Sequence, residues 1–258
     1  MALSPQPYPI LEFDEDREAI FEPGRLIPRH PDVPRCCVLC FFQEVLAGLA
    51  AAHGARQVAE IRSEQGSSPV YALSVGGQQI AVAHPGVGAP LAAGVLEELI
   101  AMGCEAFVVC GGAGVLRQDV VVGHPVIVTA AVRDEGTSYH YMAPTREVAA
   151  EPGPVAALEG VLRRYGVAYL KGKTWTTDAF YRETAGRVAL RREEGCLTVE
   201  MEAAALLAVA RFRGVALGQL LYGGDDVSGT EWDSRRWQER GSVRERLFWL
   251  AAEACLAL

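Results

Sequence analysis

The chain has 258 residues, of which 50% are hydrophobic and 22% charged. It can therefore bury a sizeable core, which excludes a mainly disordered chain. Its formal net charge of −8 argues against nucleic-acid binding, because a protein that binds the phosphate backbone needs a basic surface. The longest apolar run, residues 120–132, is interrupted by Gly123, His124 and Pro125, so we expect no membrane-spanning segment.

The cysteines and the N-terminus indicate a cellular compartment. Seven cysteines are an odd number, and most lie in apolar segments, so we expect buried free thiols and a reducing, cytoplasmic location. Residues 1–10 lack a basic stretch followed by an apolar one, and we expect no signal peptide. Cys37 and Cys40 have the spacing of a metal motif, but no second motif or spaced histidine pair follows. We therefore expect no metal site.

Residues 1–34 are rich in proline and acidic residues and predict an irregular N-terminal arm, followed by one domain at residues 35–258. In the first part of the chain, the pattern predicts a strand at 36–42, a helix at 43–53, a hairpin at 70–75 and 79–83, and a helix at 90–102. Three strands are then predicted at 106–110, 120–122 and 125–132, followed by a helix at 154–165 and strands at 167–170 and 197–199. The last predicted elements are a helix at 201–213, a strand at 215–222 and a helix at 242–258. Such alternation is typical of an α/β fold with a largely parallel or mixed central sheet.

Four segments end a predicted strand or open a predicted helix, which is where α/β folds bind ligands. They are His84–Pro90, Cys110–Val115, Val199–Ala204 and Gly223–Asp226. Glycines at such places let a ligand approach the backbone, although each is also consistent with a simple tight turn. Glu200 and Glu202 are suitable acceptors for sugar hydroxyls, or acidic residues that the dipole of the following helix favours.

Together these segments resemble the nucleoside phosphorylase-I family, and most of all its uridine phosphorylase branch. The motifs that carry the resemblance are Gly86–Gly88, Cys110–Gly114, Arg133–Tyr141, Thr176–Tyr181 and Val199–Ala204, in the family's order. The resemblance implies a single-domain three-layer α/β/α sandwich with a twisted, mostly parallel or mixed sheet. It also implies cleavage of the N-glycosidic bond of a nucleoside, usually by inorganic phosphate as co-substrate and with no cofactor. The implied assembly is a homo-oligomer built from dimers, such as a hexamer.

The resemblance also implies roles for individual residues. These are Glu200, Met201 and Glu202 for the ribose, Phe180 and Tyr181 for the base, Gly111 and Gly112 for the anion, and Asp225 or Asp226 as the acid that protonates the leaving base. An acid near the base makes chemical sense, because the departing base carries negative charge that a proton neutralises.

The chain departs from the family at the phosphate site. The family's Gly-Asp-Pro-x-Arg loop is replaced by residues 41–44, and a second phosphate arginine is replaced by Val109. Arg25 and Arg133 are the candidates to replace these arginines, since arginine has the geometry to bind phosphate. Glu44 opens an alternative, because related nucleoside hydrolases have a water-activating glutamate there. It is equally consistent with a surface residue early in a helix. A nucleoside-binding protein without catalysis is the third alternative.

Overall fold

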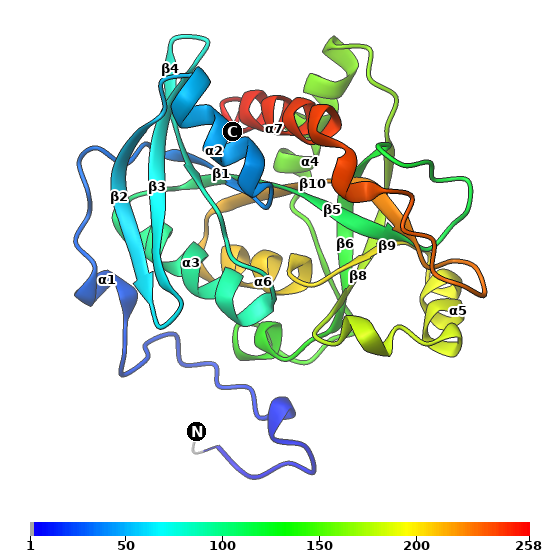
Figure 1. The fold of residues 1–258 in the computed structure, drawn as a ribbon. Helices are drawn as coiled ribbons and strands as arrows, with labels where there is room; N and C mark the ends of the chain where they lie inside the picture. Colours follow the sequence, from blue (N-terminus) through cyan, green and yellow to red (C-terminus); the bar gives the residue numbers. More distant parts are fainter. Residues whose placement is uncertain (1–2) are drawn as a thin grey trace.

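A ten-stranded sheet forms the centre of the molecule (Figure 1), which is a computed structural model describing residues 3–258. The first two residues of the predicted arm lie outside the described residues. The strand order is β10-β6-β8-β9-β5-β1-β4-β3-β2, with β7 beside β6. The strands are β1 (Cys36–Cys40), β2 (Arg56–Ser63), β3 (Gly66–Val75), β4 (Gln78–Ala83), β5 (Ala106–Val115), β6 (Pro125–Asp134), β7 (Glu147–Ala149), β8 (Leu170–Thr177), β9 (Cys196–Glu200) and β10 (Ala216–Asp226).

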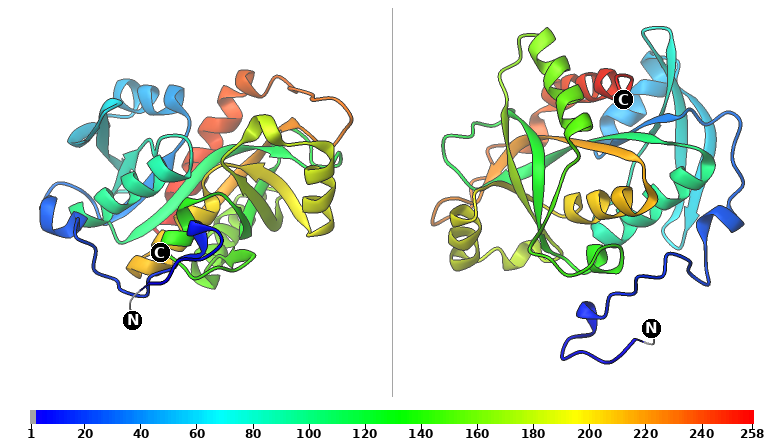
Figure 2. Two further views of the ribbon diagram at one scale, coloured as in Figure 1. Left: turned by 90° about the horizontal axis from the view of Figure 1, so that it is seen from below. Right: turned by 180° about the vertical axis from the view of Figure 1, so that it is seen from behind.

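Helices cover both faces of this sheet, with α2, α4 and α7 on one side and α3 and α6 on the other (Figures 1 and 2). The helices are α1 (Pro23–Leu26), α2 (Gln43–Ala52), α3 (Ala89–Met102), α4 (Pro152–Arg164), α5 (Ala185–Glu193), α6 (Ala203–Arg213) and α7 (Gly241–Cys255). The expected three-layer α/β fold is thereby confirmed.

Strand β1 has apolar residues at every position, and its place between two cores is the reason. Cys37 and Leu39 belong to the core that includes residues of α3 and α6. Val38 and Cys40 belong to the core that includes residues of α2, α4 and α7. A strand buried on both faces needs apolar side chains throughout, because its side chains alternate between the faces. All seven cysteines are free, as the sequence predicts, and Cys37 and Cys40 face opposite cores.

Strand β5 changes its neighbour part-way along its length. One of its edges pairs with β10 from Ala106 to Val115. The other edge pairs with parallel β1 as far as Cys110, and with antiparallel β9 from Gly114 onward. Within the described part of the chain, residues 111–113 therefore have a strand neighbour on the β10 side only. A place where neighbouring strands diverge leaves backbone groups free, and it is where open α/β sheets bind ligands.

Most predicted elements are confirmed to within a few residues, including the hairpin of β3 and β4. Two expectations were wrong. Residues 120–122 contain a bend and a turn instead of a strand, and β8 begins at Leu170, where a strand was predicted to end. The predicted strand at 106–110 is longer than expected, and the segment Cys110–Val115 forms the end of β5, because β10 offers backbone partners to its glycines. Strands β2 and β7 and helices α1 and α5 were not predicted.

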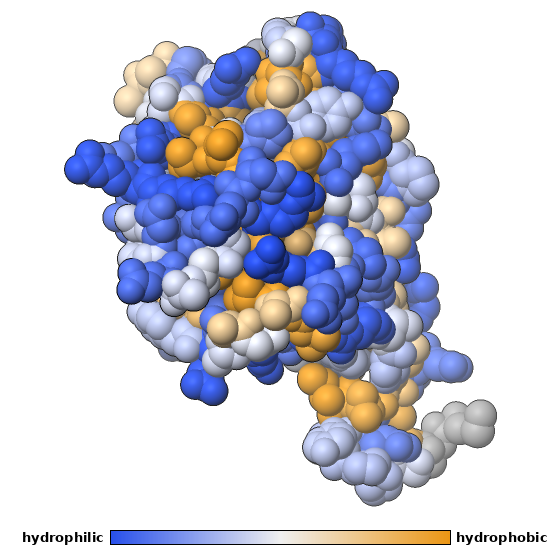
Figure 3. Space-filling model, turned by 90° about the vertical axis from the view of Figure 1, so that its right-hand side faces the viewer, coloured by the Kyte–Doolittle hydropathy of each residue, from blue (hydrophilic) through white to orange (hydrophobic). Residues whose placement is uncertain are grey.

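The N-terminal arm projects from the body of the molecule and has apolar side chains on its surface (Figure 3). Between residues 3 and 34, its regular structure is limited to α1 and the single turn η1 (Pro9–Leu11). Large apolar residues of the arm such as Ile20 and Phe21 are exposed. Between residues 3 and 258, no helix has the length and apolar character needed to cross a membrane.

Candidate active site

Glu200 ends β9 next to the point where β5 changes partner, and it is buried. Its Oε2 accepts hydrogen bonds from the backbone nitrogens of Glu202 at 2.8 Å and Ala203 at 2.6 Å. Its Oε1 accepts one from the Thr176 hydroxyl at 2.6 Å. Helix α6 begins at Ala203 because this carboxylate satisfies N–H groups that a helix start leaves free. Glu200 thus fixes the turn that presents Met201 and Glu202.

Glu202 is buried as well, and it joins two loops. Its Oε1 accepts a hydrogen bond from the backbone nitrogen of Gly88 at 2.6 Å, and its Oε2 accepts a longer one from that of Met201 at 3.3 Å. Burial, followed by the negative charge of Glu200, raises the pKa of Glu202 to about 8. The carboxylate holds the loop before α3 against the end of β9 and has further lone pairs for hydroxyl donors.

The two glycines of β5 lie where aromatic rings approach the backbone. A Cβ atom on Gly111 would lie 2.9 Å from Cδ2 of Phe41, and one on Gly112 would lie 3.1 Å from Cε1 of Tyr222. Larger residues would displace these rings, so close packing requires glycine at both positions. The ring of Phe41 also packs edge-on to His84, with centroids 5.9 Å apart. The ends of β1 and β4 therefore meet at the middle of β5.

A buried arginine that no pattern in the sequence indicated lies near Gly112. Arg244 Nε donates to the hydroxyl of Tyr222 at 3.1 Å. That hydroxyl oxygen lies 3.3 Å from the Cβ position of Gly112. Arg244 Nη1 donates to Oε1 of Glu44 at 2.5 Å. The chain thus has a cation close to the glycines, in a site from which the two usual phosphate arginines are missing.

The neighbouring aspartates at the end of β10 have different environments. Asp225 Oδ2 accepts a hydrogen bond from the indole nitrogen of Trp232 at 2.7 Å, and both its oxygens lie 3.7 Å from the Cβ position of Gly114. Asp226 accepts one from the backbone nitrogen of Ser228 at 2.7 Å and forms an ion pair with Arg235. Burial alone would raise the pKa of Asp226, but these partners lower it overall. Asp225 is therefore the aspartate beside the β5–β9 junction.

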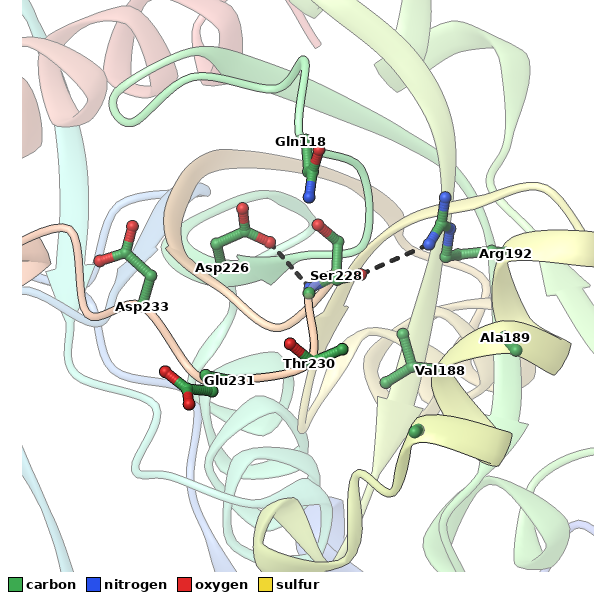
Figure 4. Close-up of a pocket in the computed structure, with 11 residues that line it drawn as sticks. Gln118, Val188, Ala189, Arg192, Asp226, Ser228, Thr230, Glu231 and Asp233 are labelled. Atoms are coloured by element: carbon green, nitrogen blue, oxygen red, sulfur yellow. Dashed lines mark hydrogen bonds between the residues drawn. The ribbon is translucent and has the colours of Figure 1, made fainter.

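Asp226 borders a separate pocket of about 630 Å³ between α5 and residues 226–233 (Figure 4). Gln118, Arg192 and Glu231 also line it, and Arg192 Nη1 donates to the carbonyl of Ser228 at 3.4 Å. Of the residues predicted for the site, Asp226 alone reaches this pocket. Neither Glu200 nor Glu202 is among the residues that line this pocket.

The predicted base residues lie on the short turn η3 (Phe180–Arg182) that follows β8. Phe180 is 49% exposed and Tyr181 is 89% exposed. Their ring centroids are 4.1 Å apart. Exposed ring faces at a strand end are available for stacking on a flat ligand.

Neither Arg25 nor Arg133, the candidates to replace the missing phosphate arginines, lies in this cluster with N–H groups free to bind an anion. Arg133 is buried, and its donors are bonded to Ser138 Oγ, the Thr145 hydroxyl and the carbonyls of Met142 and Ala143, at 2.7–2.9 Å. Arg25 lies in α1 of the arm and pairs with Glu18. Their assignment to phosphate stays a prediction that the geometry does not support.

The motifs around this cluster belong to a known family. A family model described as "Phosphorylase superfamily" matches residues 35–247. The chain belongs to this superfamily. The match confirms the resemblance drawn from the sequence, and it begins one residue before β1.

Two curated relatives and one solved structure illustrate the superfamily membership. The chain is 30% identical over 161 residues to a guanosine phosphorylase of Halorubrum lacusprofundi, covering 62% of this chain and 67% of that one. It is 33% identical over 156 residues to a uridine phosphorylase of Thermococcus kodakarensis, covering 55% and 56%. The matches thus span about two thirds or less of these relatives. The fold is similar to a uridine phosphorylase of Vibrio fischeri, with a TM-score of 0.72, 22% identity and coverage of 90% and 97%.

Proposed function

We propose that this phosphorylase-superfamily protein is an enzyme that cleaves the N-glycosidic bond of a nucleoside, with inorganic phosphate as co-substrate and no cofactor. The observation that carries the proposal is the buried carboxyl group of Glu202, which directly follows β9, the strand that pairs with β5 just beyond its unpaired residues 111–113. An acceptor for sugar hydroxyls thus follows the strand that adjoins backbone groups available to an anion. The names of the two curated relatives, a guanosine and a uridine phosphorylase, support the same reaction.

The proposed reaction assigns a task to each part of the cluster. Glu202 accepts hydrogen bonds from ribose hydroxyls and orients the sugar. Backbone amides near Gly111 and Gly112, with Arg244, hold phosphate below the anomeric carbon. A phosphate oxygen bonds to that carbon as its bond to the base nitrogen breaks, which yields a sugar 1-phosphate. A proton transferred through Asp225 neutralises the base as it leaves.

Hydrolysis is the second candidate, and the contact between Glu44 and Arg244 is what favours it. A carboxylate at this place repels phosphate but can take a proton from water, which then attacks the sugar. We prefer phosphate because Arg244 supplies a cation there, and because a phosphate dianion can displace Glu44 from it. A protein that only binds nucleosides is disfavoured, because binding alone has no use for Asp225 as an acid.

We also propose that the chain forms a dimer-based homo-oligomer, as a hexamer, in the cytoplasm. The exposed apolar residues of the arm, including Ile20 and Phe21, support self-association, since exposed apolar surface is often covered by a partner. The seven free cysteines support a reducing compartment.

A nucleoside panel with and without phosphate tests the proposed reaction. Guanosine, inosine, adenosine and uridine are incubated with the enzyme, and both free base and sugar 1-phosphate are measured. We expect base release that requires phosphate, with an equal amount of sugar 1-phosphate. Full activity in phosphate-free buffer, with free ribose as product, would show hydrolysis instead. No base release from any nucleoside would contradict both reactions.

A further inference from the structure

The end of helix α7 brings a thiol to the start of strand β1. The Sγ atom of Cys255, the last residue of α7, donates to the carbonyl oxygen of Cys37 at 3.3 Å and to that of Ala106 at 3.6 Å. Cys36 precedes Cys37 in β1 and is the partner of Ala106 in the parallel pairing of β1 with β5. The Cys255 thiol therefore lies against both strands at the level of Cys36.

The side chain of Cys36 lies on the same face of the sheet as Cys255. Side chains alternate between the two faces along a strand, and Val38 and Cys40 of β1 belong to the core that contains Cys255. Cys36 packs against that same core, whereas the neighbouring Cys37 belongs to the core on the other face. The thiols of Cys36 and Cys255 are thus brought together where α7 ends and β1 begins.

Cys36 differs from the other cysteines in its access to solvent. Six of the seven thiols are buried, and Cys36 is partly exposed. A hydrogen bond with Cys255 lowers the pKa of Cys36 to about 7, against the effect of burial, and the positive charge of Arg35 adds to the lowering. A thiol with such a pKa is substantially ionised at neutral pH, and the thiolate is the form that attacks electrophiles.

A second pair of neighbouring cysteines lacks this combination. Cys40 and Cys110 are partners in the pairing of β1 with β5, but both are fully buried. Burial raises the pKa of Cys110 well above its usual value. A buried, protonated thiol is inert, so this pair provides an internal comparison for Cys36 and Cys255.

We propose that Cys36 and Cys255 are a redox-active pair, a modification site at which hydrogen peroxide produces a disulfide between β1 and α7. The Cys36 thiolate attacks one oxygen of the peroxide, the O–O bond breaks, and Cys36 sulfenic acid and hydroxide form. The sulfur of Cys255 then attacks the sulfenic sulfur. The S–S bond forms as the S–O bond breaks, and water leaves with the proton of Cys255. The two thiols lose two electrons in all, and the peroxide accepts them.

Thiol counting and peptide mapping of the full chain test this site. The reduced protein is treated with hydrogen peroxide at neutral pH, and free thiols are counted in denaturant before and after the treatment. We expect the count to fall by two from the seven of the reduced protein. A non-reduced digest should contain one linked peptide that joins Cys36 to Cys255, and dithiothreitol should restore all the thiols, because exchange with a dithiol reduces the bond.

Three variants assign the roles of the two cysteines. Cys36→Ser should slow thiol oxidation at least tenfold and form no linked peptide. Cys255→Ala should stop at the sulfenic acid of Cys36, which dimedone labels. Cys40→Ala, in the fully buried pair, is the control and should form the same linked peptide as the wild type.

The map of the wild type decides the proposal even if a variant does not fold. An unchanged thiol count, a linkage that joins other cysteines or only separate chains, or a sulfinic acid on Cys36 without the linked peptide overturns it. Because this measurement needs no nucleoside and no phosphate, its outcome is independent of the proposed reaction.

Discussion

Arg244 and Glu44 are 200 positions apart in the chain, yet Nη1 of the arginine donates to Oε1 of the glutamate at 2.5 Å. Arg244 is buried, whereas the Glu44 side chain is 50% exposed. A half-exposed ion pair contributes little to stability. The Arg244–Glu44 ion pair lies after the end of β1 and near the glycines of β5. Its position therefore bears on whether phosphate or water is the nucleophile.

Arg244→Ala should raise the KM for phosphate at least tenfold and change the KM for the nucleoside by less than threefold. The reason is the loss of a charged donor to the anion, which is typically worth about 1.5–3 kcal/mol. Initial rates at varied phosphate concentration measure the effect. Arg246→Ala, an exposed residue of the same helix, is the control. If Glu44→Gln abolishes turnover while phosphate has no effect on the wild type, water is the nucleophile.

Glu202→Ala should lower kcat/KM for every nucleoside at least tenfold, because it removes an acceptor for the ribose hydroxyls. It also releases the backbone nitrogen of Gly88. Circular dichroism and the melting temperature establish whether the variant is folded. Unchanged turnover in a folded variant would show that Glu202 does not contact the sugar.

Asp225→Asn and Asp226→Asn should behave differently. Asp225→Asn should lose most activity, above all with nucleosides whose bases are poor leaving groups, because it can no longer supply a proton. Asp226→Asn should lower the melting temperature, since it weakens the ion pair with Arg235, and should affect turnover less. Rates with substrates of graded leaving-group quality measure the difference. Equal, mild losses would mean that neither aspartate protonates the base.

The stability of the fold should decrease from weakly acidic to weakly alkaline pH. Burial raises the pKa of Glu202 from 4.5 to about 8, so between these values the folded state holds a proton that the unfolded chain has lost. The free energy of unfolding therefore falls as pH rises through this window. Glu202→Gln stays neutral, and its melting temperature should fall less between pH 5 and pH 8. Melting curves that shift equally in both proteins would contradict the raised pKa.

The chain should be an oligomer of dimers at micromolar concentration. Replacing Ile20 and Phe21, both exposed on the arm, by serine should weaken the assembly if the arm lies in an interface. Sedimentation velocity measures the size of both proteins. A wild-type monomer at that concentration is the result that the proposal does not allow.

Local patterns in the sequence were sufficient for much of the fold. The uninterrupted apolar residues of β1 predict a strand buried on both faces, because alternating side chains must enter two cores. The glycines at positions 76 and 77 predict the hairpin of β3 and β4, because a tight turn requires their backbone freedom. Glu200 and Glu202 could be placed at a strand end because they lie at the border between an apolar run and an alanine-rich helical segment. These signals lie within a few neighbouring residues.

Patterns in the sequence were enough to predict the alternation of strands and helices, the strand-end segments and the two glutamates. The partner of β5 at Gly111 and Gly112, which is β10, and the contact of Arg244 with Glu44 depend on tertiary packing. The physical reason is the range of the interactions. Periodicity and turn chemistry act between near neighbours, whereas strand partners and buried charges depend on which distant segments the packed core brings together.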